Sequence, residues 1–376
     1  MVAGEASGDL LGRILLQGLK QRWPEVQAFG IGGQQLAHEG FETWWPSHKL
    51  AVRGYVEVLR HYCEIVGIRA QLLQRLLDDP PDVFIGIDAP DFNLELETKL
   101  KACGVKTVHF VSPSIWAWRP ERIEKIRRAV DHVLCIFPFE KSIYDQAGIE
   151  ATYVGHPLAN TIAQQPNKSA ARVALGLAAD DTVIAILPGS RKSEVQYLAD
   201  LFFKTLTQLN RANSALKFVV PCAPGLKDAI ALHAQRVGVA GEVQLLDGQS
   251  HAALAACDVT LIASGTATLE AALFKRPMVI AYNMHWLSWQ MMKRKKMQPW
   301  VGLPNILCQN FEVPEFLQDA ATPQALSQAV LDWLAQPEKI RALEHRFTAL
   351  HTELQRDTAQ LACHAIAKVL SSQSSR

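Results

Sequence analysis

The stretch IGIDAPDFN (85–93) decides the fold and singles out one candidate residue. The residues VFIGI (83–87) are apolar and β-branched, as in a strand buried on both faces of a parallel sheet. Asp88 follows this strand at its carboxyl end, which is where open α/β sheets bind their ligands. Asp91 stands one residue before a run of apolar residues at helical spacing, so we predict that it caps that helix.

Strand-like runs alternate with amphipathic helical segments in both halves of the chain. The runs are FGIGG (29–33), VFIGI (83–87), TVHFV (107–111), VLCIF (133–137), TYVG (152–155), TVIAIL (182–187), KFVVP (217–221), VQLLD (243–247), VTLIA (259–263) and PMVIAY (277–282). This alternation predicts parallel sheets covered by helices. Because the polar segment 155–171 is typical of a linker, we predict an α/β fold with two Rossmann-like domains, 1–165 and 166–340, facing each other across a cleft. The C-terminal helices (341–376) are expected to pack back.

The composition excludes several classes of function. A net charge of +1 over 376 residues removes a bulk electrostatic case for nucleic acid. The seven cysteines form no CxxC or Cys/His pattern, so we predict neither a zinc site nor a disulfide framework, and a reducing cytoplasm as the setting. Glu5 and Asp9 stand where a signal peptide would be apolar, and no apolar run is long enough to span a membrane. No GxGxxG is present, and no cofactor is expected.

A metal site is the first alternative for the two carboxylates. Asp88 and Asp91 form a DxxD pair, which is able to hold Mg²⁺. Helix capping by Asp91 explains the pair more simply, and no DxD, HExxH or histidine cluster is present. We therefore predict that the protein needs no metal.

Two turns in the second half suit phosphate groups. In LPGSR (187–191), the backbone amides at Gly189 and Ser190 lie beside the guanidinium of Arg191, an arrangement that suits a diphosphate. An ordinary strand-to-helix turn with a surface arginine explains this pentapeptide equally well. SGTATLE (264–270) follows the strand VTLIA and opens a helix, whose first-turn amides suit a phosphate.

The helix in SGTATLE adds a carboxylate. Thr266 and Glu270 are four residues apart and share one face, so Glu270 is placed to reach a ribose diol. The alternative is a capped helix whose acidic residue complements the helix dipole. Two such turns on neighbouring strands favour a nucleotide diphosphate. At the N-terminus, GEASGD (4–9) is a small-residue turn that lets a ligand approach the backbone, or else a tight loop capped by Ser7.

Two segments suggest contact with anionic lipid. The predicted helix 55–77 has an apolar surface wider than a core-facing helix needs, flanked by arginines. One of its two apolar stripes consists of Val58, Tyr62, Ile65, Leu72 and Leu76. The segment 286–300 interleaves Trp286 and Trp289 with lysines, as at a bilayer interface. The alternatives are a helix buried between a sheet and its neighbour, and a solvated basic turn.

Six motifs together resemble the lipid A disaccharide synthase family, which are inverting glycosyltransferases of the GT-B fold. They run in order over nearly the whole chain: VAGEASGD (2–9), IGIDAPDFN (85–93), VSPSIWAWR (111–119), LPGSR (187–191), SGTATLE (264–270) and LPN (303–305). The resemblance implies that UDP-2,3-diacylglucosamine is joined to 2,3-diacylglucosamine 1-phosphate, giving a β(1→6)-linked disaccharide and UDP in lipid A biosynthesis. It also implies a homodimer that works at the inner face of the cytoplasmic membrane.

The resemblance assigns roles to individual residues. Asp88 would be the catalytic base, and Arg191 would hold the charge that grows on the diphosphate. The residues implied to contact UDP are Ser7, Gly8, Arg191, Ser264, Gly265, Thr266, Glu270 and Asn305. One departure is that family members usually carry several residues ahead of VAGEASGD. We therefore expect a first strand shortened to a stub, or a true start upstream of Met1.

Other functions compete with this one. The nearest rivals are a UDP-N-acetylglucosamine 2-epimerase and a glycosyltransferase that makes a peptidoglycan lipid intermediate. An epimerase needs no lipid-facing surface, so the segments 55–77 and 286–300 argue against it. A catalytically silent lipid- or nucleotide-binding protein is a rival of a different class, and the joint presence of Asp88, Arg191 and Glu270 argues against it.

Overall fold

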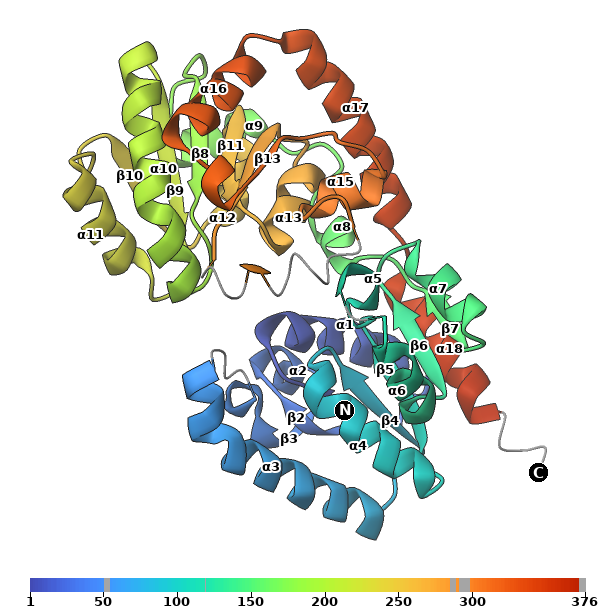
Figure 1. The fold of residues 1–376 in the computed structure, drawn as a ribbon. Helices are drawn as coiled ribbons and strands as arrows, with labels where there is room; N and C mark the ends of the chain where they lie inside the picture. Colours follow the sequence, from blue (N-terminus) through green and yellow to red (C-terminus); the bar gives the residue numbers. More distant parts are fainter. Residues whose placement is uncertain (51–54, 119, 285–288, 291–297, 372–376) are drawn as a thin grey trace. The chain divides into compact units, whose positions relative to one another are not determined.

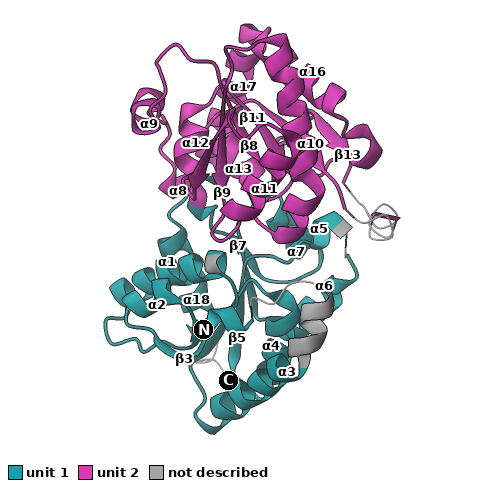
Figure 2. Cartoon of the chain, turned by 90° about the vertical axis from the view of Figure 1, so that its left-hand side faces the viewer, with its two compact units in different colours: residues 1–157, 354–376 teal, residues 158–353 magenta. Residues whose placement is uncertain are grey.

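A computed structural model describes residues 1–50, 55–118, 120–284, 289–290 and 298–371, with the backbone alone for residues 6, 55–62 and 118. The chain divides into two compact units (Figure 2): unit 1 comprises residues 1–157 and 354–376, and unit 2 comprises residues 158–353. The sequence had suggested boundaries after residues 165 and 340. Among the described residues, no helix has the length and apolar character that crossing a membrane requires.

Unit 1 is built on a parallel sheet (Figure 1). Within the described residues its strand order is β3-β2-β1-β4-β5-β6-β7. The strands are β1 (Val2–Ala3), β2 (Phe29–Gly32), β3 (Glu42–Pro46), β4 (Val83–Ile87), β5 (Lys106–Phe110), β6 (His132–Cys135) and β7 (Ala151–Tyr153). The order reverses between β1 and β4, which pair in parallel. In open α/β sheets, ligands bind beside such a reversal, at the carboxyl ends of the strands. The carboxyl ends of β1 and β4 are therefore the first place to look for a site.

The helices of unit 1 include one from the far end of the chain. They are α1 (Ala6–Arg22), α2 (Gln34–His38), α3 (Tyr55–Asp78), α4 (Pro90–Ala102), α5 (Ile115–Trp118), α6 (Arg122–Ala129), α7 (Glu140–Gln146) and α18 (Thr358–Ser371), with a short 3₁₀ helix η1 (Ser47–Lys49). Helix α18 packs against α1, β6 and β7. A Cβ at Gly18 of α1 would lie 2.9 Å from the Cβ of Ala359, so a small residue is needed there. The C-terminal helix therefore packs back onto the first unit, as predicted.

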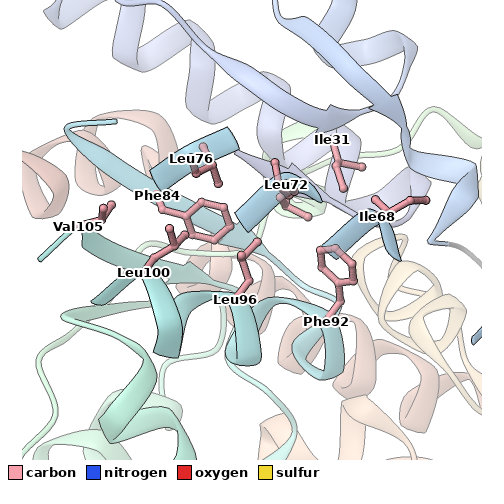
Figure 3. Packing of buried hydrophobic residues seen from close by; sticks show 10 residues of the cluster. Ile31, Ile68, Leu72, Leu76, Phe84, Phe92, Leu96, Leu100 and Val105 are labelled. Atoms are coloured by element: carbon pink, nitrogen blue, oxygen red, sulfur yellow. The ribbon is translucent and has the colours of Figure 1, made fainter. Parts of the chain in front are cut away.

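The core of unit 1 includes one face of α3 (Figure 3). Leu72 and Leu76 point toward Phe84 of β4 and Leu96 of α4, and they are only 0% and 2% exposed. The prediction that these two leucines contact lipid is therefore wrong. Full burial of a leucine side chain stabilises a fold by about 1.5–3 kcal/mol, which accounts for this apolar stripe without a membrane.

Unit 2 contains a second parallel sheet, with the order β10-β9-β8-β11-β12-β13 within the described residues. Its strands are β8 (Val183–Leu187), β9 (Lys217–Cys222), β10 (Val243–Asp247), β11 (Val259–Ala263), β12 (Met278–Tyr282) and β13 (Glu315–Leu317). Its helices include α9 (Lys168–Ala174), α10 (Lys192–Ala212), α11 (Lys227–Val237), α12 (Ser250–Ala256), α13 (Thr266–Leu273), α15 (Leu303–Cys308), α16 (Pro323–Leu334) and α17 (Pro337–Leu354), with a 3₁₀ helix η2 (Gln318–Ala320). The order reverses between β8 and β11, so each unit has its own reversal point.

The segment 155–171 is more structured than a linker. It contains α8 (Pro157–Thr161) and the start of α9 at Lys168, where the side chain of Asn167 accepts a hydrogen bond from the Ala170 amide at 2.9 Å. Proline is favourable at the first helical position, and Asn is a preferred N-cap. The prolines and polar residues that suggested a loop therefore mark helix starts instead.

Candidate active site

Asp88 lies at the carboxyl end of β4, beside the reversal point of the first sheet. Its backbone is in the left-handed region, with φ of 53°, and Ala89 follows at 44°. Val111, just after the neighbouring strand β5, has φ of 76°, which is rare for a β-branched residue. Strained backbone of this kind clusters at functional sites. Asp88 is half-buried, and within the described part of the chain no hydrogen bond or ion pair engages its carboxylate.

Asp91 has a different role from the one predicted. Helix α4 begins at Pro90 with Ala89 as its N-cap, so Asp91 lies inside the first turn and makes no capping bond. Its side chain is 81% exposed and forms an ion pair of 2.6 Å with Nη2 of Arg122. The left-handed turn at Asp88 and Ala89 brings the chain into the helix two residues earlier than the sequence indicated. The capping prediction for Asp91 is therefore wrong.

The turn between β1 and α1 packs against the Asp88 turn. A Cβ at Gly4 would lie 3.0 Å from the Cβ of Ala89, and one at Gly8 would lie 3.5 Å from the carbonyl oxygen of Ile87. Helix α1 begins at Ala6 with Glu5 as its N-cap, so Ser7 does not cap it and is exposed in the first turn. The small residues thus allow two neighbouring strand ends to approach closely.

Asp9 has a structural role in this turn. Its buried carboxylate accepts hydrogen bonds from the amides of Gly33, Gln35 and Leu36 at 2.7, 2.9 and 3.2 Å. These amides belong to the start of α2, where the first N–H groups have no partner within the helix. The last residue of the GEASGD motif therefore connects α1 to the start of α2.

In unit 2, the LPGSR turn follows β8 and holds a carboxylate from its own helix. Gly189 has φ of 130°, and a Cβ there would overlap Glu194. The amide of Ser190 donates to Glu194 Oε2 at 2.9 Å, and Nη1 of Arg191 donates to Glu194 Oε1 at 3.0 Å. Ser190 and Arg191 are both exposed. Glu194 therefore engages the donors that the sequence assigned to a diphosphate.

The SGTATLE turn lies on the neighbouring strand, as predicted. Strand β11 pairs with β8, and Ile262 lies opposite Leu187. Gly265 is the N-cap of α13, and Thr266 is exposed in its first turn. Ser264 donates its hydroxyl to the carbonyl of Val301 at 3.2 Å. The two turns predicted to bind phosphate therefore follow neighbouring strands, at the carboxyl ends of β8 and β11.

Glu270 has a partner that the sequence did not indicate. Its Oε2 lies 3.3 Å from Nε2 of His251, which belongs to α12, and the His251 ring contacts Phe274 edge-on at 5.2 Å. His251 is separated by nineteen positions from Glu270 and stands in no motif, so only the fold reveals the pair. It places a second polar side chain beside the predicted ribose contact.

Asn305 is fully buried and uses its whole side chain within the protein. Its Nδ2 donates to Val313 O and to Glu315 Oε1, both at 2.8 Å. Its Oδ1 accepts from the amides of Glu312 and Val313 at 2.8 and 2.9 Å. An asparagine amide has two donor and two acceptor sites, and all four are occupied here. The Asn305 side chain therefore fixes the loop that follows α15, and the contact of Asn305 with UDP stays a prediction.

A family model described as lipid-A-disaccharide synthetase matches residues 1–369. Lipid-A-disaccharide synthases from Albidiferax ferrireducens and Verminephrobacter eiseniae are 65% and 60% identical to this chain over 375 residues. Each alignment covers 98% of this chain and 96% of the relative. The chain belongs to the lipid-A-disaccharide synthase family. It is accordingly a glycosyltransferase of lipid A biosynthesis, and this reading is favoured over the rival functions.

Solved structures support the fold that this family membership implies. A glycosyltransferase from Rickettsia africae has a TM-score of 0.60 at 10% identity, covering 99% of this chain and 96% of that one. A UDP-N-acetylglucosamine 2-epimerase from Neisseria meningitidis, solved with UDP-N-acetylglucosamine, has a TM-score of 0.62 at 11% identity, covering 97% and 96%. At these identities the likeness concerns the fold alone. The predicted α/β fold of the GT-B type, with two units, is confirmed.

The remaining residues predicted to contact lipid are only partly described. Ile65 is partly buried and packs against the core of unit 1, and Trp289 is half-buried. The side chains of Val58 and Tyr62, and the whole of Trp286, lie outside the described residues. Of the predicted stripe on α3, the described part thus belongs to the core or its edge.

Sequence reasoning missed a buried carboxylate behind the VSPSIWAWR motif. Trp116 donates its indole N–H to Glu140 Oε1 at 3.0 Å, and the amides of Ile136 and Phe137 donate to Glu140 Oε2 at 3.2 and 3.0 Å. Burial raises the pKa of Glu140 to about 7, although these hydrogen bonds act in the opposite direction. The only sequence signal was an acidic residue at the start of α7. Through these hydrogen bonds, Glu140 connects Trp116 to the loop that follows β6.

Proposed function

We propose that this member of the lipid-A-disaccharide synthase family joins UDP-2,3-diacylglucosamine to 2,3-diacylglucosamine 1-phosphate with inversion at the anomeric carbon. The products are a β(1→6)-linked disaccharide 1-phosphate and UDP. The family supports a glycosyl transfer in lipid A biosynthesis. The family resemblance supports inversion, and the local geometry of each unit supports the residue roles.

The observation that carries the proposal is the Asp88 carboxylate, which has no partner among the described residues. Inversion requires one displacement, in which the acceptor 6-hydroxyl attacks the anomeric carbon while the bond to the diphosphate oxygen breaks. A carboxylate without an ion-pair partner is available to take the hydroxyl proton during this step. We therefore assign Asp88 the role of general base and unit 1 the acceptor side of the reaction.

The leaving UDP requires cations and N–H dipoles where its negative charge grows. Arg191 and the Ser190 amide provide a guanidinium and a backbone donor after β8, and α13 begins after the neighbouring strand. We assign these groups to the diphosphate and the His251–Glu270 pair to the ribose. We further propose, on the family resemblance alone, that UDP is contacted by Ser7, Gly8, Ser264, Gly265, Thr266 and Asn305. Unit 2 would thus be the nucleotide-binding unit, and no metal takes part in the proposed step.

We also propose peripheral contact with the cytoplasmic face of the inner membrane, in a homodimer. The composition of the first half of α3 and of the segment 286–300 supports the membrane contact, and the family resemblance alone supports the homodimer. Replacing Val58 and Tyr62 with serine should lower co-sedimentation with vesicles that contain anionic lipid. If binding to these vesicles is unchanged, this surface is not the membrane contact.

The reaction is tested by incubating the full chain with both proposed substrates. Mass spectrometry should detect the disaccharide 1-phosphate, and the UDP released should match it one to one. NMR of the new linkage reports the anomeric configuration. A rival epimerase would instead convert UDP-N-acetylglucosamine without an acceptor, so that incubation is the parallel control. Epimerisation without disaccharide formation would overturn the proposal.

A further inference from the structure

A buried polar cluster lies behind the Asp88 turn and belongs to none of the predicted contacts. Glu97 of α4 and His109 of β5 are both 0% exposed, and Glu97 Oε1 lies 2.8 Å from His109 Nδ1, within hydrogen-bond distance. Ionisable side chains are rarely buried this completely, because removing them from water is unfavourable. A hydrophobic pair would fill the same space without that penalty, so the polar pair needs an explanation.

Asn93 connects this cluster to Asp88. It lies one helical turn before Glu97 on α4, is fully buried, and donates a hydrogen bond from Nδ2 to the backbone carbonyl of Asp88 at 2.8 Å. Gly86 belongs to β4 and has no side chain, which leaves the space that Asn93 and Glu97 occupy. A Cβ there would lie 2.9 Å from the Cβ of Asn93 and would overlap Glu97 Oε1.

Three atoms of the cluster have no hydrogen-bond partner among the described residues: Asn93 Oδ1, Glu97 Oε2 and His109 Nε2. Most buried polar atoms in folded proteins are paired, so three orphans in one layer oppose stability instead of adding to it. The hydrogen bond from Asn93 reaches Asp88, a residue whose left-handed backbone is itself unfavourable. A role in positioning the Asp88 turn gives a reason to keep a cluster that does not add to stability.

We propose that Asn93 is a positioning residue for Asp88, and that the Glu97–His109 pair holds Asn93 in place. The hydrogen bond from Asn93 Nδ2 fixes the Asp88 carbonyl, and with it the left-handed conformation that sets the carboxylate at the end of β4. This inference rests on the proposed function, in which Asp88 is the general base.

The test replaces Asn93 with leucine, which has a similar volume and leaves no polar atom behind. The substitution removes the unsatisfied Asn93 Oδ1 but also the donor to the Asp88 carbonyl, so urea unfolding should show no more than the modest loss of stability typical of one buried hydrogen bond. We nevertheless expect kcat to fall by about 10- to 100-fold, because small displacements of a reacting group slow the chemical step by such factors. The KM of both substrates should stay within about threefold of the wild-type values, since binding is not the step affected.

A matched control lies on the same strand as His109. Thr107 is fully buried, and its hydroxyl donates to the carbonyl of Ala129 at 2.8 Å, near the start of β5. Thr107→Val should lose stability and keep its kcat. If Asn93→Leu keeps a wild-type kcat, the inference is wrong. Should the leucine variant fail to fold, Asn93→Ala provides the same comparison of kcat with KM, and a wild-type kcat in that variant likewise overturns the inference.

The double variant separates this inference from the proposed function. If Asn93 acts only through Asp88, Asp88→Asn combined with Asn93→Leu should be no slower than Asp88→Asn alone. Additive losses would show that Asn93 acts by another route. If Asp88→Asn alone retains near-normal turnover, the general base itself is wrongly assigned. An inactive Asp88→Asn beside an active Asn93→Leu overturns the positioning role only.

Discussion

Two carboxylates near the central strand ends of the two sheets differ in what surrounds them. Asp88, after β4, has a left-handed backbone with φ of 53° and no partner for its carboxylate within the described residues. Glu194 lies in the first turn of α10, after β8, and accepts hydrogen bonds from the Ser190 amide and from Arg191. One carboxylate is thus free on a strained turn, and the other is paired on a regular helix.

The difference follows from what each end of a glycosyl transfer needs. A general base needs a lone pair available to receive a proton, and the Asp88 carboxylate, which stands on a strained backbone, has one. The donors of a diphosphate site are cationic and exposed, and a nearby carboxylate satisfies them when no ligand is bound. We infer that Glu194 stands where a phosphate oxygen of UDP would bind.

The largest effect is expected at the free carboxylate. Asp88→Asn keeps the size of the side chain and removes its basicity, so kcat should fall by about 10²- to 10⁴-fold, the usual contribution of a general base. Calorimetry should show UDP binding unchanged, because Asp88 is not among the proposed UDP contacts. Turnover within a few-fold of wild type would remove Asp88 from the comparison altogether.

The amino-acid sequence alone was sufficient to place both carboxylates shortly after the carboxyl end of a parallel strand. Alternating strands and helices predicted the parallel sheets, and the motifs after 87, 187 and 263 fall at strand ends as expected. The role of Asp91 was not predictable, because it depends on the left-handed turn at Asp88 and Ala89. A residue-by-residue propensity does not indicate such a turn, since Ala rarely adopts the left-handed conformation.

Contacts between residues far apart in the sequence were the second feature that could not be predicted. Leu72 and Leu76 form an apolar stripe that suits a bilayer and a protein core equally, because both environments exclude water. Only the position of Phe84 and Leu96 decides between them. Asn305 was assigned to UDP through resemblance, and its four internal hydrogen bonds became visible only in the fold. The His251–Glu270 pair likewise joins two helices that share no motif.

Glu140 is a third carboxylate for this comparison, and it differs from the other two because it is both buried and hydrogen-bonded. The pKa of Glu140 is raised by burial from 4.5 to about 7, so the folded state binds more protons than the unfolded state between these values. Its contribution to stability is complete below about pH 4.5 and is lost as the pH rises toward 7, a change of up to about 3 kcal/mol for a fully buried group.

Glu140→Gln removes this titration. We expect the stability of wild type relative to the variant to decrease between pH 5 and pH 8, measured by urea unfolding at each pH. Taking the difference cancels the contribution of His156, whose pKa burial lowers to about 4 and which acts with the opposite sign. Parallel stability profiles for the two proteins would show that Glu140 is already ionised in the fold.

Removing Arg191, the cation that pairs with Glu194, should lower the affinity for UDP and leave the chemical step unchanged. Arg191→Ala deletes a charge-assisted contact with the diphosphate, which is typically worth about 1.5–3 kcal/mol, or roughly 10- to 100-fold in UDP affinity. Calorimetry with UDP measures the loss directly. Uridine, which has no phosphate, should bind the variant and the wild type equally. An equal loss for uridine and UDP would mean that the substitution disturbs the whole unit.

The smallest effect, and the most informative one, is expected from Glu194→Gln. Glutamine keeps an oxygen that accepts from the Ser190 amide, but it removes the negative charge that competes with a phosphate for Arg191. If Glu194 occupies the ligand's place, UDP affinity should rise by about three- to tenfold, which corresponds to roughly 1 kcal/mol. If Glu194 instead orients Arg191 for the ligand, the same substitution should weaken UDP binding. Glu242→Gln, at an exposed glutamate that accepts from Asn210 Nδ2 at 2.8 Å, is the control for a general change of charge in unit 2. The sign of the change relative to this control decides whether the two carboxylates differ as a free base and a displaceable anion, or only in their degree of pairing.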